Sequence, residues 1–289
     1  MGFPNGEGRR PCRGNNSLVK RQVLFWLMVL CTALYAAPTL VIGTGAPGGV
    51  YLSYGAKLAS IVGLSPRQSA GSVENLKLIR SGEAQLGLTT VDSALDAVQG
   101  KGAYVDGGPV PVQAMAVLYP SMLHVVTLES SSLRTLADLS GRRVSLGSPG
   151  SSSQTAAGRL LRIANIPVIP SFLSIQDATR ALQAGEIDAF CWINGLPCVA
   201  IANMKQPVRL LDATPHLQEL VKLYGPLYTE AAIPGGTYPG CPDEARAISL
   251  NNILVCSTAL SEDAVYGLLT TMFDQMEQVR GIHPSAARL

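Results

Sequence analysis

The chain contains 289 residues, of which 47% are hydrophobic and 15% charged, and its formal net charge at pH 7 is +2. This length is sufficient for one large domain or two smaller ones with buried cores. Five of the 22 basic residues and one of the 20 acidic residues lie within the first 36 positions, so the remainder has 17 basic and 19 acidic residues and a net charge of −2. This balance excludes nucleic acid as a partner bound through charge.

The N-terminal region has the pattern of a secretory signal. Residues 23–37 are apolar, follow two basic residues, and end in small side chains before Pro38. The run is shorter than the roughly 18–20 residues of a membrane span, and a basic flank before such a run is typical of a signal peptide. We therefore expect residues 1–37 to be a signal peptide with a long polar leader. An uncleaved anchor is the alternative, and a translation start near residue 18 is a further hypothesis.

The first structural unit after this region is a strand, a glycine-rich loop and a helix. Residues 40–42 are apolar and mostly β-branched, residues 43–49 include four glycines, and residues 52–62 place apolar side chains at helical spacing. A loop of this kind exposes backbone N–H groups at the positive end of a helix. The sequence therefore predicts an anion-binding loop, with a plain tight turn as the alternative.

The same loop matches the dinucleotide-binding pattern G-x-G-x-x-G through Gly43, Gly45 and Gly48. That pattern also requires an acidic residue about twenty positions further on, to hold a ribose hydroxyl. No acidic residue follows before Glu74. We therefore do not expect a nucleotide cofactor.

The next segments alternate between strand and helix patterns. Residues 66–70 form a short extended piece, and a helix is predicted from an N-cap at Ser72 to a stop at Gly82. A buried strand at 84–88 precedes a helix at 91–98. This alternation predicts a parallel sheet covered by helices.

A second strand–loop–helix unit lies in the middle of the chain. Residues 101–111 read as a surface loop, and 112–119 and 122–128 as two strands, between which the chain could cross to another lobe. Further on, the small-residue loop 148–155 precedes a helix at 156–164. A flexible linker is the alternative for this serine run. The two loops lie at the carboxyl ends of strands, so they are expected to face one cleft and to bind a small carboxylate.

The remaining segments complete an α/β chain. The predicted elements are a strand at 172–174, a helix at 175–182, a strand at 187–193, a helix ending near 204, a strand at 208–211, a helix at 216–224, a strand at 247–256 and a helix at 261–279. Residues 229–240 are rich in glycine and proline and are expected to form a hinge or lid.

Four cysteines lie outside the expected signal: Cys191, Cys198, Cys241 and Cys256. Their spacing fits no zinc pattern, and the three histidines are scattered singly, so we expect no metal site. The sequence leaves two alternatives open. The cysteines form one or two disulfides, with three possible pairings for a fully paired set, or they are buried thiols. His124 is expected to be structural.

The motifs of common hydrolases do not occur. The chain contains no G-x-S-x-G, no S-x-x-K and no H-E-x-x-H, and neither candidate loop contains histidine. We expect a binding protein rather than an enzyme. An exported hydrolase is the alternative.

Several motifs in order resemble one family of solute receptors. The matching stretches are 42–45 with 48–51, 71–76, 141–151, Gly195 with Pro197, and 233–234 with 236–240. The chain resembles the TAXI class of receptors of tripartite ATP-independent periplasmic (TRAP) transporters. The resemblance implies a type II periplasmic-binding-protein fold of two α/β lobes, 38–121 plus 243–289 and 122–242. It also implies a periplasmic receptor that binds glutamate, 2-oxoglutarate or another dicarboxylate and delivers it to membrane subunits. A stand-alone sensor is an alternative.

The resemblance also implies which residues bind the ligand. The loops carried over by position supply most of them, and tyrosines are expected to wall the cleft. The candidate ligand-binding residues are Gly45, Ala46, Gly48, Gly49, Tyr51, Ser72, Asn75, Thr90, Asp92, Tyr119, Ser148, Gly150, Ser151, Ser152, Ser153, Thr155, Gly195, Gly236, Thr237 and Tyr238. Asp92 is expected to bind an amino group or to cap a helix. Ala46 and Pro47 replace the hydroxyl residues usual in the family's first loop, which favours a less polar organic acid.

Overall fold

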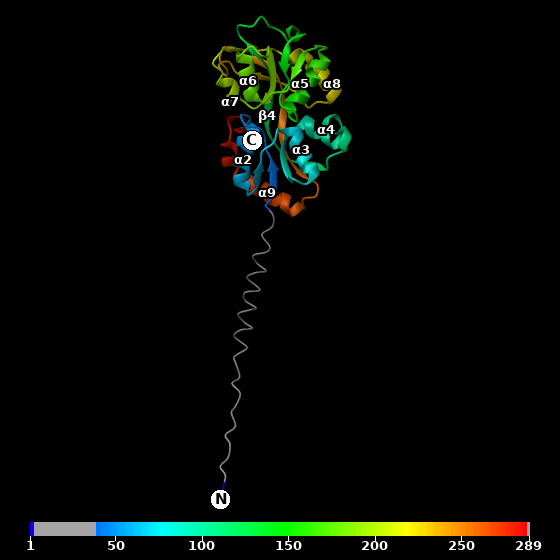
Figure 1. Cartoon of the computed structure of the whole chain (residues 1–289), viewed down its shortest axis with the longest axis vertical. Coiled ribbons are helices and arrows are strands. Elements are labelled where there is room, and N and C mark those ends of the chain that lie inside the picture. Colours follow the sequence, from blue (N-terminus) through cyan, green and yellow to red (C-terminus); the bar gives the residue numbers. More distant parts are fainter. Residues whose placement is uncertain (3–38, 288–289) are drawn as a thin grey trace. The chain divides into compact units, whose positions relative to one another are not determined.

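The computed structural model describes residues 1–2 and 39–287, and residues 40–289 form one compact unit (Figure 1). The apolar run at 23–37, on which the prediction of a signal peptide rests, lies outside the described residues. Within the described part of the chain, no helix is both long enough and apolar enough to cross a membrane.

Ten strands in the described residues form one mixed sheet, in the order β2-β1-β3-β10-β4-β7-β5-β6, with β8 paired to β4 and β9 to β10. The strands are β1 Val41–Gly43, β2 Ser65–Arg67, β3 Leu86–Thr90, β4 Val112–Leu128, β5 Arg143–Ser145, β6 Ile169–Ser171, β7 Ala189–Asn194, β8 Val208–Leu210, β9 Thr229–Ile233 and β10 Ala245–Ser257. The two ends of the sheet are parallel, as predicted, whereas every pair that involves β4 or β10 is antiparallel.

The two strands predicted at 112–119 and 122–128 are one long strand, β4. Its first part pairs with β10, and its last residues pair with β7 and β8. Pro120 cannot donate a hydrogen bond, but it lies opposite Asn251, next to a register shift of the β4–β10 ladder. A proline is tolerated at such an irregularity. The two predicted strands are therefore one, and near Pro120 its pairing passes from β10 to β7.

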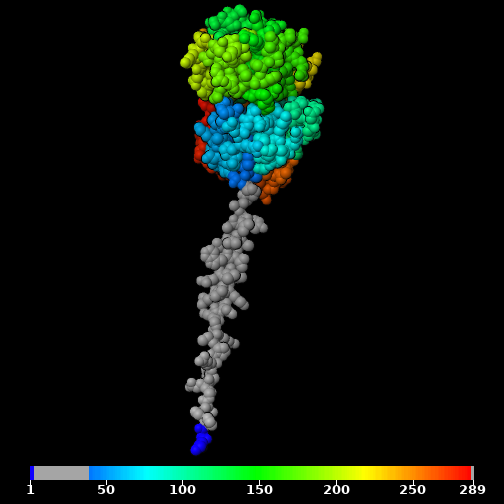
Figure 2. Space-filling model, in the orientation of Figure 1, coloured from blue at the N-terminus to red at the C-terminus, as the bar shows by residue number. Residues whose placement is uncertain are grey.

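Two groups of helices flank the sheet, one at each end (Figure 1). Near β1–β3 lie α2, α3, α4 and α9, and near β5–β8 lie α5, α6, α7 and α8. The helices are α2 Val50–Val62, α3 Ser72–Ser81, α4 Val91–Gln99, α5 Ser152–Ile163, α6 Ile175–Gln183, α7 Val199–Ala202, α8 Leu217–Tyr224, α9 Glu262–Asp274 and α10 Met276–Arg280. Figure 2 shows the two groups meeting along a line that crosses one face of the molecule.

Three local predictions were wrong. The segment predicted as a hinge or lid begins with strand β9, because its backbone pairs with β10. The strand expected at 172–174 lies three residues closer to the N-terminus, as β6 at Ile169–Ser171. The single final helix is interrupted at Gln275, which ends α9 and precedes α10. The neighbouring strand decides the first two cases, since a short segment becomes a strand only where a partner strand is available.

β7 shows how the core of the β5–β8 end is built. Cys191 and Ile193 point into a buried cluster that contains α5 and α8 residues, and Phe190 and Trp192 point into another with α6 and α7 residues. Both faces of the strand are therefore covered by helices. This explains its continuous apolar sequence and places its end deep in the molecule.

All four described cysteines are free thiols. Burial raises the pKa of Cys191 to about 12 and that of Cys198 to about 11. They behave as small apolar side chains, which was one of the two alternatives left open by the sequence.

Candidate functional site

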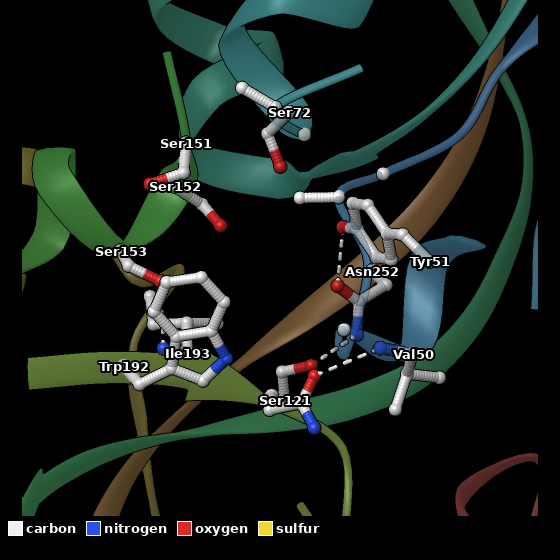
Figure 3. Close-up of a pocket in the computed structure, with 16 residues that line it drawn as sticks. Val50, Tyr51, Ser72, Ser121, Ser151, Ser152, Ser153, Trp192, Ile193 and Asn252 are labelled. Atoms are coloured by element: carbon white, nitrogen blue, oxygen red, sulfur yellow. Dashed lines mark hydrogen bonds between the residues drawn. The ribbon is translucent and has the colours of Figure 1, made fainter. Parts of the chain in front are cut away.

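A small pocket lies where the predicted anion loop and the predicted serine loop meet (Figure 3). The centre of a water molecule can occupy about 40 Å³ of it. The residues that line it are Gly45, Ala46, Gly49, Val50, Tyr51, Ala70, Gly71, Ser72, Ser121, Ser151, Ser152, Ser153, Trp192, Ile193, Asn194 and Asn252. Segments from both ends of the sheet therefore build one site.

The start of α2 forms one wall. The helix follows β1 through a short loop, and its N-cap is Gly49, which offers no side chain to the first-turn N–H groups. The Gly49 N–H donates to the carbonyl of Ala46 at 3.2 Å. The Val50 N–H donates to Oδ1 of Asn194 at 3.3 Å, which ties the helix start to the end of β7. The positive end of the α2 dipole thus lies at the pocket.

The start of α5 forms the opposite wall. The hydroxyl of Ser151 caps the helix by accepting from the Gln154 N–H at 3.3 Å. The Ser153 hydroxyl accepts from the N–H of Ile193 at 2.9 Å. No residue of the described chain hydrogen-bonds to the hydroxyl of Ser152, which points into the pocket in Figure 3. This hydroxyl is therefore available to a ligand.

Asn252 organises the floor between the two walls. Its Oδ1 accepts from the Tyr51 hydroxyl at 2.5 Å, and its Nδ2 donates to the Tyr119 carbonyl at 2.8 Å and to the Ser121 hydroxyl at 2.7 Å. Burial raises the pKa of Tyr51, so this hydroxyl stays protonated. Both polar atoms of the Asn252 side chain are therefore hydrogen-bonded within the protein, and the bond from Tyr51 holds that ring in place.

The pocket contains no charged side chain. It is lined by two helix starts, hydroxyls, amides and the indole of Trp192. Hydrogen-bond donors and positive helix ends together favour an anion, whereas an ammonium group would find no carboxylate here. Over residues 1–2 and 39–287, no cluster of three or more potential metal ligands occurs.

Eight of the predicted site residues line this pocket. They are Gly45, Ala46, Gly49, Tyr51, Ser72, Ser151, Ser152 and Ser153. Ser72 differs in its role from the prediction: Gly71 is the N-cap of α3, and Ser72 is its first residue. Its hydroxyl accepts from the Thr90 N–H at 3.1 Å, and this bond orients it toward the pocket.

Asn75 and Thr90 lie behind the pocket and position it. Nδ2 of Asn75 donates to the carbonyls of Thr44 and Leu88, both at 2.7 Å, and so joins the ends of β1 and β3. The hydroxyl of Thr90 donates to Ser93 at 3.0 Å. Neither side chain lines the pocket, and the polar atoms of both are hydrogen-bonded within the protein.

Asp92 does not face the pocket. Its carboxylate is fully buried and forms an ion pair with Nη1 of Arg159 at 3.1 Å. It also accepts from the Tyr228 hydroxyl at 2.7 Å. Since these partners occupy it, the structure does not support the expectation that Asp92 binds an amino group of a ligand.

Tyr119 and Tyr238 are buried elsewhere. Tyr119 stacks edge-on against Tyr54, with ring centroids 5.1 Å apart. The Tyr238 hydroxyl lies 2.8 Å from Nε2 of His124 and accepts from the Cys198 N–H at 3.0 Å. Neither tyrosine walls the pocket, because both rings belong to the core.

Three further candidates serve close contacts or turns outside the pocket. Gly195 allows the C-terminal segment to approach, since a Cβ there would lie 2.5 Å from Oγ of Ser285. Gly236 and Thr237 form a turn after β9, in which the Thr237 hydroxyl donates to the Pro234 carbonyl at 2.6 Å.

The last four candidates lie in the two loops or in the first turn of α5, and none of them lines the pocket. Gly48, at φ 83°, touches α6, and a Cβ there would lie 3.1 Å from Ile175. The Ser148 carbonyl accepts from the Ser151 hydroxyl at 2.7 Å. Gly150 and Thr155 line a second cavity, of about 750 Å³, between α3, α4, α5 and α8.

The sequence reasoning missed eight residues that line the pocket: Val50, Ala70, Gly71, Ser121, Trp192, Ile193, Asn194 and Asn252. Trp192 and Ile193 end the strand predicted at 187–193, and Asn194 follows it, so the rule that ligands lie at carboxyl ends of strands could have found them. Ser121 and Asn252 lie within long antiparallel strands. No sequence signal marks these two.

Acid is expected to destabilise the fold through His124, whose burial lowers its pKa from 6.5 to about 4. The unfolded chain binds a proton below its higher pKa, whereas the folded protein does so only near pH 4. Stability present at neutral pH is therefore lost between pH 6.5 and 4, by about 3 kcal/mol. Denaturation of wild type and His124→Gln at pH 7 and pH 4 measures this. Equal acid losses in the two proteins would contradict the prediction.

Comparison with known proteins identifies the family and the fold. The model of the NMT1-like family matches residues 42–289, and the chain belongs to that family. One similar structure was solved in work on glutathione import via GshT and the cystine ABC importer TcyBC of Streptococcus mutans. Its TM-score is 0.55 at 11% sequence identity, and the match covers 86% of this chain and 94% of that chain. A second similar structure is an ancestral arginine-binding protein bound to arginine. Its TM-score is 0.52 at 15% sequence identity, and the match covers 86% of this chain and 97% of that chain.

The substrate-binding protein of an amino acid ABC transporter is a third similar structure, with a TM-score of 0.51 at 12% identity, covering 87% of this chain and 100% of the other. At these identities the similarity shows the fold alone. The chain has the mixed α/β fold of these three proteins, which confirms the predicted fold class.

Proposed function

We propose that this member of the NMT1-like family is the extracytoplasmic receptor of a TRAP-type transporter of the TAXI class. It captures a small organic acid between the starts of α2 and α5. The observation that supports this most is that both helix starts line one pocket in which no side chain is charged. Helix dipoles, N–H groups and hydroxyls would stabilise the anion there.

The proposed mechanism is binding without chemistry. The pocket lining includes no histidine, carboxylate, lysine or cysteine, so it offers no general base and no activated nucleophile. The ligand would therefore leave unchanged. Two lobes, 38–121 with 243–289 and 122–242, would close on it and present the closed form to membrane subunits.

The ligand class follows from charge and size. Asp92 lies outside the pocket and is bound to Arg159 and Tyr228, and the pocket lining holds no carboxylate for an ammonium group. An organic acid without an amino group therefore fits better than glutamate. The volume of about 40 Å³ suits a compact acid, and a dicarboxylate requires the loops to move apart.

Calorimetry and thermal shift on the chain from Pro38 onward test this proposal. Pyruvate, propionate, 2-oxoglutarate and glutamate serve as ligands, and we expect saturable binding of at least one acid without an amino group. At a hundred times its dissociation constant the ligand adds about 2.7 kcal/mol to the free energy of unfolding. Glutamate should bind at least about tenfold more weakly than 2-oxoglutarate, because its ammonium group is unpaired.

A matched pair of serine variants locates the binding. Ser152→Ala removes the free hydroxyl and should lower the affinity about tenfold, whereas Ser132→Ala, at an exposed position, should not change it. Absence of binding by every acid, or turnover of the acid, would contradict the receptor. Uptake into vesicles with the cognate membrane subunits that required ATP would contradict the TRAP assignment.

A further inference from the structure

Trp192 has a buried hydrogen-bond donor that no protein atom satisfies. The residue lies in the second half of β7, it is 5% exposed, and its ring packs among apolar residues such as Met122 and Ile201. Among the described residues, no atom accepts a hydrogen bond from its Nε1. Buried polar groups are almost always paired, so this one requires an explanation.

The indole nitrogen faces the candidate pocket. Trp192 lines that pocket together with Ser121, Val50 and Ser152. In Figure 3 the edge of the indole that carries the nitrogen lies toward the space between these residues. The donor is therefore directed at the place where a ligand would lie.

No acceptor of the pocket lining lies within hydrogen-bond distance of Nε1, and the hydroxyl of Ser152, which is free, does not reach it either. Oδ1 of Asn252 already accepts from Tyr51, and Oδ1 of Asn194 accepts from the Val50 N–H. The Ser153 hydroxyl accepts from the N–H of Ile193. Because no acceptor among the described residues reaches Nε1, the partner of Trp192 has to come from outside the protein.

The geometry points to Trp192 as a specificity-determining residue that donates a hydrogen bond to a second oxygen of the ligand. This inference rests on the proposed function, in which the starts of α2 and α5 hold the acid group. The pocket is small, so the second oxygen is close to that group. A 2-oxo or 2-hydroxy acid carries such an oxygen, and a simple alkanoic acid does not.

Fluorescence provides a direct test. A chain from Pro38 onward keeps the compact unit 40–289 and contains Trp192 as its single tryptophan, since Trp26 is the other one in the sequence. Pyruvate should change the emission of this indole in a saturable way. Pyruvate binding seen by calorimetry with no change in emission would overturn the contact.

A comparison of ligand pairs isolates the hydrogen bond. Trp192→Phe removes the donor and keeps an aromatic ring. We expect it to weaken pyruvate binding about tenfold and to leave propionate binding within about twofold, with 2-oxoglutarate and glutarate as a second pair. Unchanged propionate binding shows that the pocket of the variant is folded.

The outcomes separate this inference from the proposed function. If Trp192→Phe keeps the preference of the wild type for the oxo acid, the role of Trp192 is wrong while the receptor stands. If no acid binds to the wild type, the proposed function itself is wrong. An equal loss for both members of a pair would assign the ring a packing role and overturn the hydrogen bond.

Discussion

Replacing Arg159 by methionine is expected to lower the free energy of unfolding by about 3–5 kcal/mol. The Arg159 side chain is 9% exposed and lies between two carboxylates of α4. It forms ion pairs with Asp92 at 3.1 Å and with Asp96, and it donates to the Tyr228 hydroxyl at 2.9 Å. The Tyr224 ring covers the guanidinium at 4.1 Å.

The expected loss is large because methionine would leave the buried Asp92 and the partly buried Asp96 without their cation. Taking one partner from a buried ion pair costs far more than the pair itself contributes. The double variant Asp92→Asn/Arg159→Met should therefore recover part of the stability, since fewer charges remain unpaired. α4 and α5 belong to different proposed lobes, so the single variant should also weaken ligand binding by destabilising the closed form.

Chemical denaturation measures this effect. Arg162→Met is a matched control, because Arg162 lies on the same helix and is exposed. It should change the free energy of unfolding by less than about 0.5 kcal/mol. A loss below about 1 kcal/mol for Arg159→Met would show that the cluster contributes no more than a surface ion pair.

The second large effect is expected for Asn75→Asp, at about 4 kcal/mol. This change keeps the shape of the side chain but replaces the amide donor by an acceptor. The carbonyls of Thr44 and Leu88 would then face a carboxyl oxygen instead of the N–H groups they now bind at 2.7 Å. Two buried carbonyls would lose their partner, each at a cost of roughly 1–3 kcal/mol.

Asn251→Asp is the control for this substitution. Asn251 is exposed on β10, where an added charge is solvated, so its unfolding midpoint should stay close to that of the wild type. Asn75→Asp should in addition weaken ligand binding, because the Thr44 carbonyl belongs to the loop that precedes Gly45. If Asn75→Asp instead had the stability of the wild type but bound the ligand more weakly, the prediction would be wrong and Asn75 would be a ligand contact.

Local patterns located most helices and the parallel ends of the sheet. The helices near residues 50–62, 72–81 and 91–99 follow apolar spacing and glycine stops, which act over a few residues of chain. The long strand through Pro120 and the pairing of β9 did not follow from such patterns. Both depend on β10, which lies more than 100 residues after Pro120 in the sequence.

The candidate site divides in the same way. The glycine loop before α2 and the serine run before α5 were recognisable, because backbone N–H groups at helix starts need small residues around them. Asn75 and Asp92 have the same residue types as ligand contacts, yet the fold surrounds them with Thr44, Leu88, Arg159 and Tyr228. Their roles depend on which neighbours use their polar atoms.

By itself, the sequence determined the α/β class and the two loops that build the pocket, since each is encoded by consecutive residues. Only the tertiary structure decided which side chains face that pocket. Ser121, Trp192 and Asn252 are far apart in sequence and meet because β4, β7 and β10 are neighbours in one sheet. A side chain is available to a ligand only when the folded protein does not satisfy it, and for Trp192 that depends on contacts across the whole chain.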